Sequence, residues 1–175
     1  RAGRLTVDDF STKESKKQPS PPFKTSTLQQ EASRRCGFAP KRTMRIAQAL
    51  YEGIEIPGRG PTGLITYMRT DSLRLAPEAL ESSRAFIANS FGRNYLPDKP
   101  NEYMPKGKAQ DAHEAIRATD AMLTPESIKD YLTPEQYRLY ELIWSRFIAS
   151  QMRDAVVART NLVCSSADYQ MKQSG

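Results

Sequence analysis

The sequence predicts a mainly α-helical chain with a small β component. Apolar residues recur at helical spacing in several stretches, and proline, serine or threonine marks where these stretches begin. Near both ends of the chain, apolar residues alternate instead, which predicts strands. We therefore expect a helical domain over residues 22–152, an N-terminal strand and linker at 1–21, and C-terminal strands at 153–175.

Composition favours a nucleic-acid partner. The 175 residues carry a formal net charge of +6, which suits an acidic partner. Cys36 and Cys164 form no C-x-x-C motif, so they are expected to be small buried residues in a reducing compartment. No apolar run approaches the length of a membrane span, so no membrane partner is expected. Because the chain starts at Arg1, it is expected to be a piece of something longer.

The first half predicts a helix-turn-helix. Residues 4–10 alternate weakly and predict one strand, whereas residues 11–22 are polar and proline-rich and predict an exposed linker. Ser26, three residues before Gln29, predicts a capping box that starts a helix ending at Gly37. Pro40 predicts a second helix ending at Gly53, whose inward side is expected to hold Met44, Ala47, Leu50 and Tyr51.

A turn-rich loop over residues 54–62 and a strand over residues 64–68 follow these helices. Two short helices followed by a strand favour a winged-helix arrangement. The outward side of the helix pair is basic and is expected to contact phosphates; it includes Arg34, Arg35, Lys41, Arg42 and Arg45.

The second half predicts helices and a final strand. Pro77 predicts a helix that buries Phe86, Ile87 and Phe91, and residues 93–110 predict a loop. Thr124-Pro125 and Thr133-Pro134 predict two more helix starts, the second running to Met152 with its aromatic residues in the core. Residues 155–164 alternate and predict a strand that pairs near Tyr169 or Leu5.

One segment indicates chemistry. In Gly63-Leu-Ile-Thr-Tyr-Met-Arg-Thr-Asp-Ser72, a strand would place Ile65, Tyr67 and Arg69 on one face. A free phenol is a weak nucleophile at neutral pH, and a neighbouring cation favours its phenolate. The same guanidinium could hold a phosphate. His113, the only histidine, lies four residues before Arg117, which would share its face on a helical turn.

This segment resembles the active-site segment of the bacterial type IA DNA topoisomerases. Three more blocks resemble the same family in the same order, so the resemblance runs from Pro22 to Met152. These blocks are Pro22-Phe-Lys-Thr-Ser-Thr-Leu-Gln-Gln30, Thr43-Met-Arg-Ile-Ala-Gln-Ala-Leu-Tyr-Glu-Gly53 and Ala112-His-Glu-Ala-Ile-Arg-Ala-Thr-Asp120.

The resemblance implies roles for particular residues. Tyr67 would attack one DNA strand and become joined to a 5′-phosphate, Arg69 would stabilise the added charge, and His113 would steady a neighbouring phosphate. The family usually has proline where this chain has Ala118. Further DNA contacts are expected at Arg117, Gln48, Glu52, Thr66, Arg45, Lys41 and Arg42.

The resemblance also implies what this chain lacks. In the family, Mg²⁺ binds an acidic cluster in a separate TOPRIM domain, and no Asp-x-Asp-x-Glu run occurs here. We therefore expect no metal or cofactor bound by this fragment, and little cleavage by it alone. The two ends would be strands of a discontinuous β-rich gate domain. The expected partners are single-stranded or negatively supercoiled DNA and the rest of the enzyme, in the bacterial cytoplasm at the nucleoid.

Two other hypotheses stay open on the residues alone. One is a winged-helix DNA-binding module without chemistry, in which Tyr67 only packs. The other is a tyrosine recombinase, which places its nucleophile after several arginine motifs, whereas Tyr67 precedes them here.

Overall fold

The computed structural model describes residues 4–103, 113–166 and 168–175, and the chain divides into two compact units. One unit joins Arg1–Gln18 to Asp154–Gly175, and the other is Pro19–Arg153. Helices and antiparallel strands are both present, so the chain is a mixed α and β structure. Each unit is described separately below.

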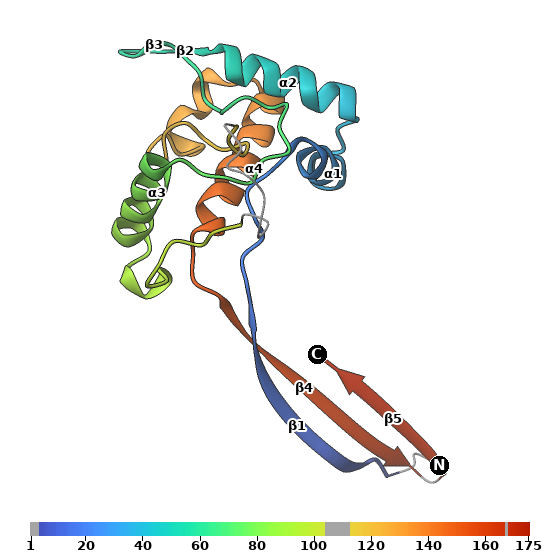
Figure 1. Ribbon diagram of the computed structural model, residues 1–175. Coiled ribbons are helices and arrows are strands. Elements are labelled where there is room, and N and C mark those ends of the chain that lie inside the picture. Colours follow the sequence, from blue (N-terminus) through green and yellow to red (C-terminus); the bar gives the residue numbers. More distant parts are fainter. Residues whose placement is uncertain (1–3, 104–112, 167) are drawn as a thin grey trace. The chain divides into compact units, whose positions relative to one another are not determined.

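The first unit is a three-stranded antiparallel sheet in the order β1-β4-β5 (Figure 1). Its strands are β1 (Thr6–Lys17), β4 (Ala155–Ser166) and β5 (Tyr169–Ser174). β4 pairs with β1 from Thr6 opposite Ser165 to Lys17 opposite Ala155, and it pairs with β5 at Ser166 opposite Tyr169. Both partners expected for the strand at 155–164 are therefore confirmed. The prediction of a linker at residues 11–22 was wrong for residues 11–17, which belong to β1. Ladder hydrogen bonds to β4 order this polar segment, and its composition alone did not reveal that partner.

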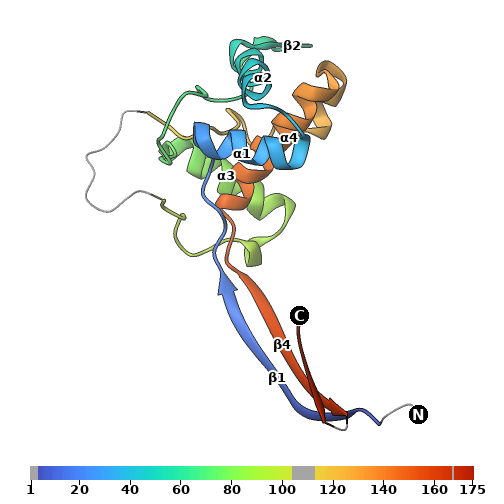
Figure 2. The same cartoon turned by 90° about the vertical axis from the view of Figure 1, so that its right-hand side faces the viewer.

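The second unit is a helical bundle around α4 (Pro134–Ser150). This helix packs against α1 (Thr25–Cys36), α2 (Pro40–Glu52) and α3 (Pro77–Ser90) (Figures 1 and 2). Two short 3₁₀ helices complete it, η1 (Arg93–Tyr95) and η2 (Glu126–Tyr131). The core side of α4 is almost fully buried, as its apolar spacing predicted, and includes Leu139, Tyr140, Ile143, Phe147 and Ile148.

Most helix boundaries follow the predicted signals. Pro40 and Pro77 open α2 and α3, and the Thr133 capping box opens α4. Gly37 ends α1 in the left-handed conformation at φ 70°. Two details were wrong: α1 begins at Thr25 rather than at a Ser26 cap, and α4 ends before Met152. Thr124-Pro125 does start a helix, but it is a 3₁₀ helix.

Three connecting segments differ from the prediction. The expected loop at 54–62 contains a hairpin, β2 (Ile54–Ile56) paired with β3 (Gly60–Thr62). The expected strand at 64–68 is one isolated bridge, from Ile65 to Ala118, and the expected helical turn at 113–117 is extended and bridges Phe23 through Ile116. Close packing explains why Gly63 precedes the tyrosine segment: a Cβ there would lie 2.8 Å from the Tyr51 carbonyl oxygen.

Two residues predicted to face inward are exposed instead. Tyr51 is 41% exposed and Phe91 is 45% exposed. Both stand at the C-terminal end of a helix, beyond its last buried residue. The buried side of α2 is Thr43, Ile46, Ala47 and Leu50.

Candidate functional site

Tyr67 lies at the surface of the second unit beside another tyrosine. Its side chain is 46% exposed, and its ring meets that of Tyr51 edge to face, with centroids 5.5 Å apart and planes at 66°. Two phenols therefore stand together on this surface. The sequence predicts Tyr51 only as a core residue, because it lies on the helical spacing of the core.

Tyr67 and Arg69 are both exposed, while the residues that alternate with them are buried. Met68 is fully buried and Thr70 is 8% exposed. The predicted alternation thus holds from Tyr67 onward, although no regular strand forms. It fails for Ile65, which was expected on the same face as Tyr67 and Arg69 but is 1% exposed, because its bridge to Ala118 places it in the core.

Two pockets adjoin at this segment. A pocket of about 240 Å³ is lined by Tyr67 and Tyr51 together with Thr66 and Glu114. A pocket of about 640 Å³ is lined by Arg69 and Asp71 and by the first turn of α1. Thr70 and His113 line both pockets. The fold therefore brings His113 to Tyr67 on one side and to Arg69 on the other.

The start of α1 is fixed to the tyrosine segment by hydrogen bonds. The Thr25 amide donates to the Thr70 carbonyl at 2.9 Å, and the Thr25 hydroxyl donates to the Met68 carbonyl at 2.8 Å. The first turn of α1 contains no acidic residue. Its positive end and Arg69 thus line one pocket, which favours an anion there.

The sequence analysis assigned no role to the α1 residues that line this larger pocket, Thr25, Ser26 and Gln29. The sequence signal that could have indicated these residues was the block Pro22–Gln30, which resembles the family.

The extended segment at 113–118 is held against the tyrosine segment by Thr66. The Thr66 hydroxyl donates to the Ala115 carbonyl at 2.6 Å and accepts from the Arg117 amide at 3.0 Å. The Thr66 amide donates to the Arg117 carbonyl at 3.0 Å. These bonds position His113. They also engage the Thr66 hydroxyl, whose contact with DNA stays a prediction.

Arg117 lies behind the pockets rather than beside His113 on a helix. Its side chain is 12% exposed, pairs with Glu114 at 2.7 Å and donates to the Ala118 carbonyl at 3.0 Å. The guanidinium also lies 5.9 Å from the centroid of the Phe147 ring. The flanking backbone bonds use the amides of Thr66 and Thr119, not that of Ala118, so a proline at position 118 would fit the same pairing.

The remaining predicted contacts lie on α2. Lys41, Arg45, Gln48 and Glu52 recur every three or four residues and form one stripe along the helix. Gln48 donates to Glu52 at 2.6 Å, next to Tyr51. Arg42 lies off this stripe, where it pairs with Glu135 and stacks 5.4 Å from the Phe38 ring centroid.

Thr66→Val should loosen the site and destabilise the second unit. The substitution keeps the shape but leaves the Ala115 carbonyl and the Arg117 amide without this partner, which costs about 1–3 kcal/mol. Urea unfolding followed by fluorescence of Trp144, the only tryptophan, measures this. Thr119→Val is the matched control, since its exposed hydroxyl makes one bond, to Gly63 at 2.7 Å. Equal losses in the two variants would contradict the assignment.

Within the described ranges, no cluster of three or more histidine, cysteine, aspartate or glutamate side chains could hold a metal ion. In that same part of the chain, no helix combines the length and the apolar character needed to cross a membrane.

Comparison with known proteins identifies the class. A family model described as "DNA topoisomerase" matches residues 1–175. The DNA topoisomerase 1 of Xylella fastidiosa is 55% identical over 161 residues, which is 91% of this chain and 20% of the relative. That of Helicobacter pylori is 54% identical over 165 residues, which is 93% of this chain and 22% of the relative.

A solved structure agrees. Full-length topoisomerase I from Thermotoga maritima superposes with a TM-score of 0.82 at 42% identity, over 97% of this chain and 27% of that one. The chain therefore belongs to the bacterial type IA DNA topoisomerase family. It spans about a fifth of the length of the curated relatives that it matches.

Proposed function

We propose that this chain carries the strand-cleaving tyrosine of an enzyme that relaxes negatively supercoiled DNA by transient single-strand cleavage, strand passage and religation. The observation that carries the proposal is the exposed Tyr67 phenol in a pocket that shares His113 with the pocket of Arg69. Membership of the topoisomerase family supports it.

In the proposed reaction, the Tyr67 oxygen attacks a DNA phosphorus atom. A bond from this oxygen to phosphorus forms as the bond from phosphorus to the 3′ oxygen breaks. The strand then ends in a free 3′ hydroxyl, and its 5′-phosphate is joined to Tyr67. One phosphoester replaces another, so the 3′ hydroxyl can attack in return and reseal the strand.

The surrounding cations would stabilise this exchange. Arg69 would hold the non-bridging oxygens, where negative charge develops, and His113 would hold a neighbouring phosphate. The first turn of α1 adds its positive end to the Arg69 pocket. Arg117, through Glu114 and Thr66, would position the His113 segment, and the α2 stripe and Arg42 would guide the strand toward Tyr67.

We propose that the remaining parts of the site lie outside this chain. The family resemblance implies Mg²⁺, which would be held by a TOPRIM domain. The sheet of the first unit exposes apolar side chains, including Phe10 at 66% and Tyr169 at 79%. Such exposure suits strands of a larger gate domain that other segments cover.

A second candidate function is a DNA-binding module without chemistry. The order α1, α2 and the β2–β3 hairpin suits a helix-turn-helix with a wing, and the exposed basic residues of α2 favour phosphate contact. In this alternative, binding would occur without any covalent product. A tyrosine recombinase would instead give an adduct at a 3′-phosphate.

One experiment separates these functions. The matched part of this chain replaces the corresponding 161 residues of the Xylella fastidiosa relative, and the chimera is mixed with Mg²⁺ and a single-stranded oligonucleotide. The expected product is a covalent adduct in which mass mapping finds the 5′-phosphate on Tyr67. Binding without an adduct would favour the module, and a 3′-phosphate adduct would overturn the topoisomerase assignment.

A further inference from the structure

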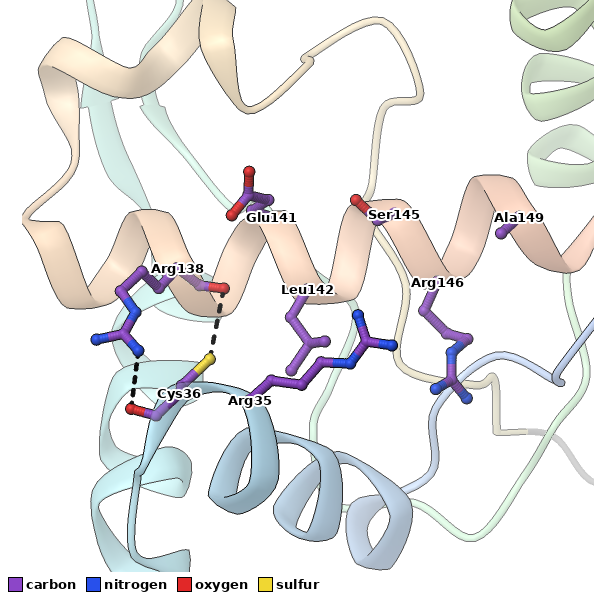
Figure 3. Close-up of a pocket in the computed structure, with 8 residues that line it drawn as sticks. All are labelled: Arg35, Cys36, Arg138, Glu141, Leu142, Ser145, Arg146 and Ala149. Carbon is purple, nitrogen blue, oxygen red and sulfur yellow. Dashed lines mark hydrogen bonds between the residues drawn. The ribbon is translucent and has the colours of Figure 1, made fainter. Parts of the chain in front are cut away.

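A groove of about 450 Å³ runs between the C-terminal half of α1 and the outer side of α4 (Figure 3). Three arginines and one glutamate line it, so its lining carries an excess of two positive charges. Figure 3 shows Arg138 and Arg146 reaching from α4 toward α1, and Arg35 reaching back along the groove. Leu142, which is 7% exposed, lies at the floor of the groove between them.

The nearby carboxylate does not neutralise these cations. Glu31 pairs with Arg34 at 2.9 Å and Arg35 at 3.0 Å, and more distantly with Arg146 at 3.8 Å. The hydrogen bond from Arg34 lowers the pKa of Glu31, with the charges of Arg146 and Arg35 in support. Glu31 is therefore ionised, but it is one negative charge among three positive ones.

Arg146 is the cation with the most to gain from an anion. Burial lowers its pKa, and the neighbouring charges of Arg35 and Arg34 lower it further, against the opposing effect of Glu31. Its guanidinium is fixed in place 4.4 Å from the Phe23 ring centroid. A negative ligand in the groove would offset the repulsion among these arginines.

The arrangement fits a ligand with repeated negative charges. Arg138 and Arg146 lie eight residues apart on α4, which is about 12 Å along the helix axis. Arg138 is held by donating to the Cys36 carbonyl at 3.0 Å, and it remains exposed. Positive charges spaced along one helix match the repeated phosphates of an extended strand.

We propose that this groove binds the phosphate backbone of single-stranded DNA, as a contact separate from the two pockets at Tyr67. The proposal rests on the proposed function, because that function supplies DNA as the ligand. No residue that lines this groove lines either tyrosine pocket. The groove would hold a strand while Tyr67 acts on another stretch of DNA.

The first test blocks the groove without deleting an arginine. Ser145 is exposed and lines the groove, so Ser145→Glu places a carboxylate there at a position that tolerates it. The affinity of this chain for an oligothymidylate of about 16 nucleotides should fall about 10-fold. The slope of log affinity against log salt concentration should become shallower by about the amount that one phosphate contact contributes. Asn89→Glu, on the exposed side of α3, makes the same charge change elsewhere and should have little effect. Equal effects of the two variants would overturn the proposal.

The second test uses Cys36, which lies in the groove, whereas Cys164 is buried in the other unit. Burial raises the pKa of the Cys36 thiol, so alkylation is followed at alkaline pH, with mass mapping to identify the modified cysteine. The oligonucleotide should slow alkylation of Cys36 several-fold, and less so in Ser145→Glu. Polyglutamate of matched charge should protect Cys36 less than the oligonucleotide does, and equal protection by polyglutamate would overturn the assignment to DNA.

The two proposals fail separately. An unprotected Cys36 in a protein that still forms the Tyr67 adduct would overturn the groove alone. Protection of Cys36 without any adduct in the chimera would overturn the proposed function and leave the groove as a nucleic-acid site.

Discussion

Tyr67→Phe is expected to abolish the covalent DNA adduct while leaving DNA binding intact. Loss of the nucleophilic oxygen should reduce cleavage by the chimera at least about 10³-fold. The ring remains and still packs against Tyr51, so the free energy of unfolding should change by no more than about 0.5 kcal/mol. Gel separation of the adduct and fluorescence anisotropy of a labelled oligonucleotide measure the two quantities.

Tyr51→Phe is the matched control, because its phenol stands beside that of Tyr67 and lines the same pocket. It should keep the adduct, with at most a modest change in rate. An adduct that survives Tyr67→Phe and disappears in Tyr51→Phe would assign the attack to Tyr51 and would contradict the mechanism.

Arg69→Ala is expected to give the second largest effect. Removing a cation aimed at developing charge costs about 10²–10³-fold in rate, and the loss should fall on cleavage more than on binding. Arg69 is exposed and has no ion-pair partner among the described residues, so its removal should leave the fold unchanged. Single-turnover cleavage by the chimera measures the effect.

Two variants define the role of Arg69. Arg69→Lys keeps the charge but loses the paired donors of the guanidinium, so cleavage should lie between that of the original and that of Arg69→Ala. Arg93→Ala removes an exposed arginine from η1, away from both tyrosine pockets, and should leave cleavage unchanged. If Arg69→Ala cleaves as well as Arg93→Ala, the proposed role of Arg69 is wrong.

Local signals predicted the helices well because their physical causes are local. Pro40 and Pro77 can stand at the first position of a helix, and Thr133 and Gln136 satisfy each other across one turn. Gly37 adopts a backbone conformation that other residues rarely adopt. None of these effects needs a distant partner.

Segments whose structure depends on a distant partner were predicted poorly. Residues 11–17 read as a polar linker, yet their partners in β4 lie more than a hundred positions away in the sequence, as with Thr12 opposite Thr160. The His113 segment read as a helical turn because His113 and Arg117 are four residues apart. Its actual partner is Thr66, whose hydroxyl bonds to Ala115 across 49 positions.

The sequence by itself determined the starts of α2, α3 and α4, the shared face of Tyr67 and Arg69, and the resemblance that the family match confirmed. Only the tertiary structure decided that His113 lines the pockets of both residues, that Tyr51 stands beside Tyr67, and that α1 and α4 enclose an arginine-lined groove. The physical reason is that caps and helical spacing act within a few residues. A pocket is instead formed by hydrogen bonds and packing between segments whose separation along the chain carries no local signal.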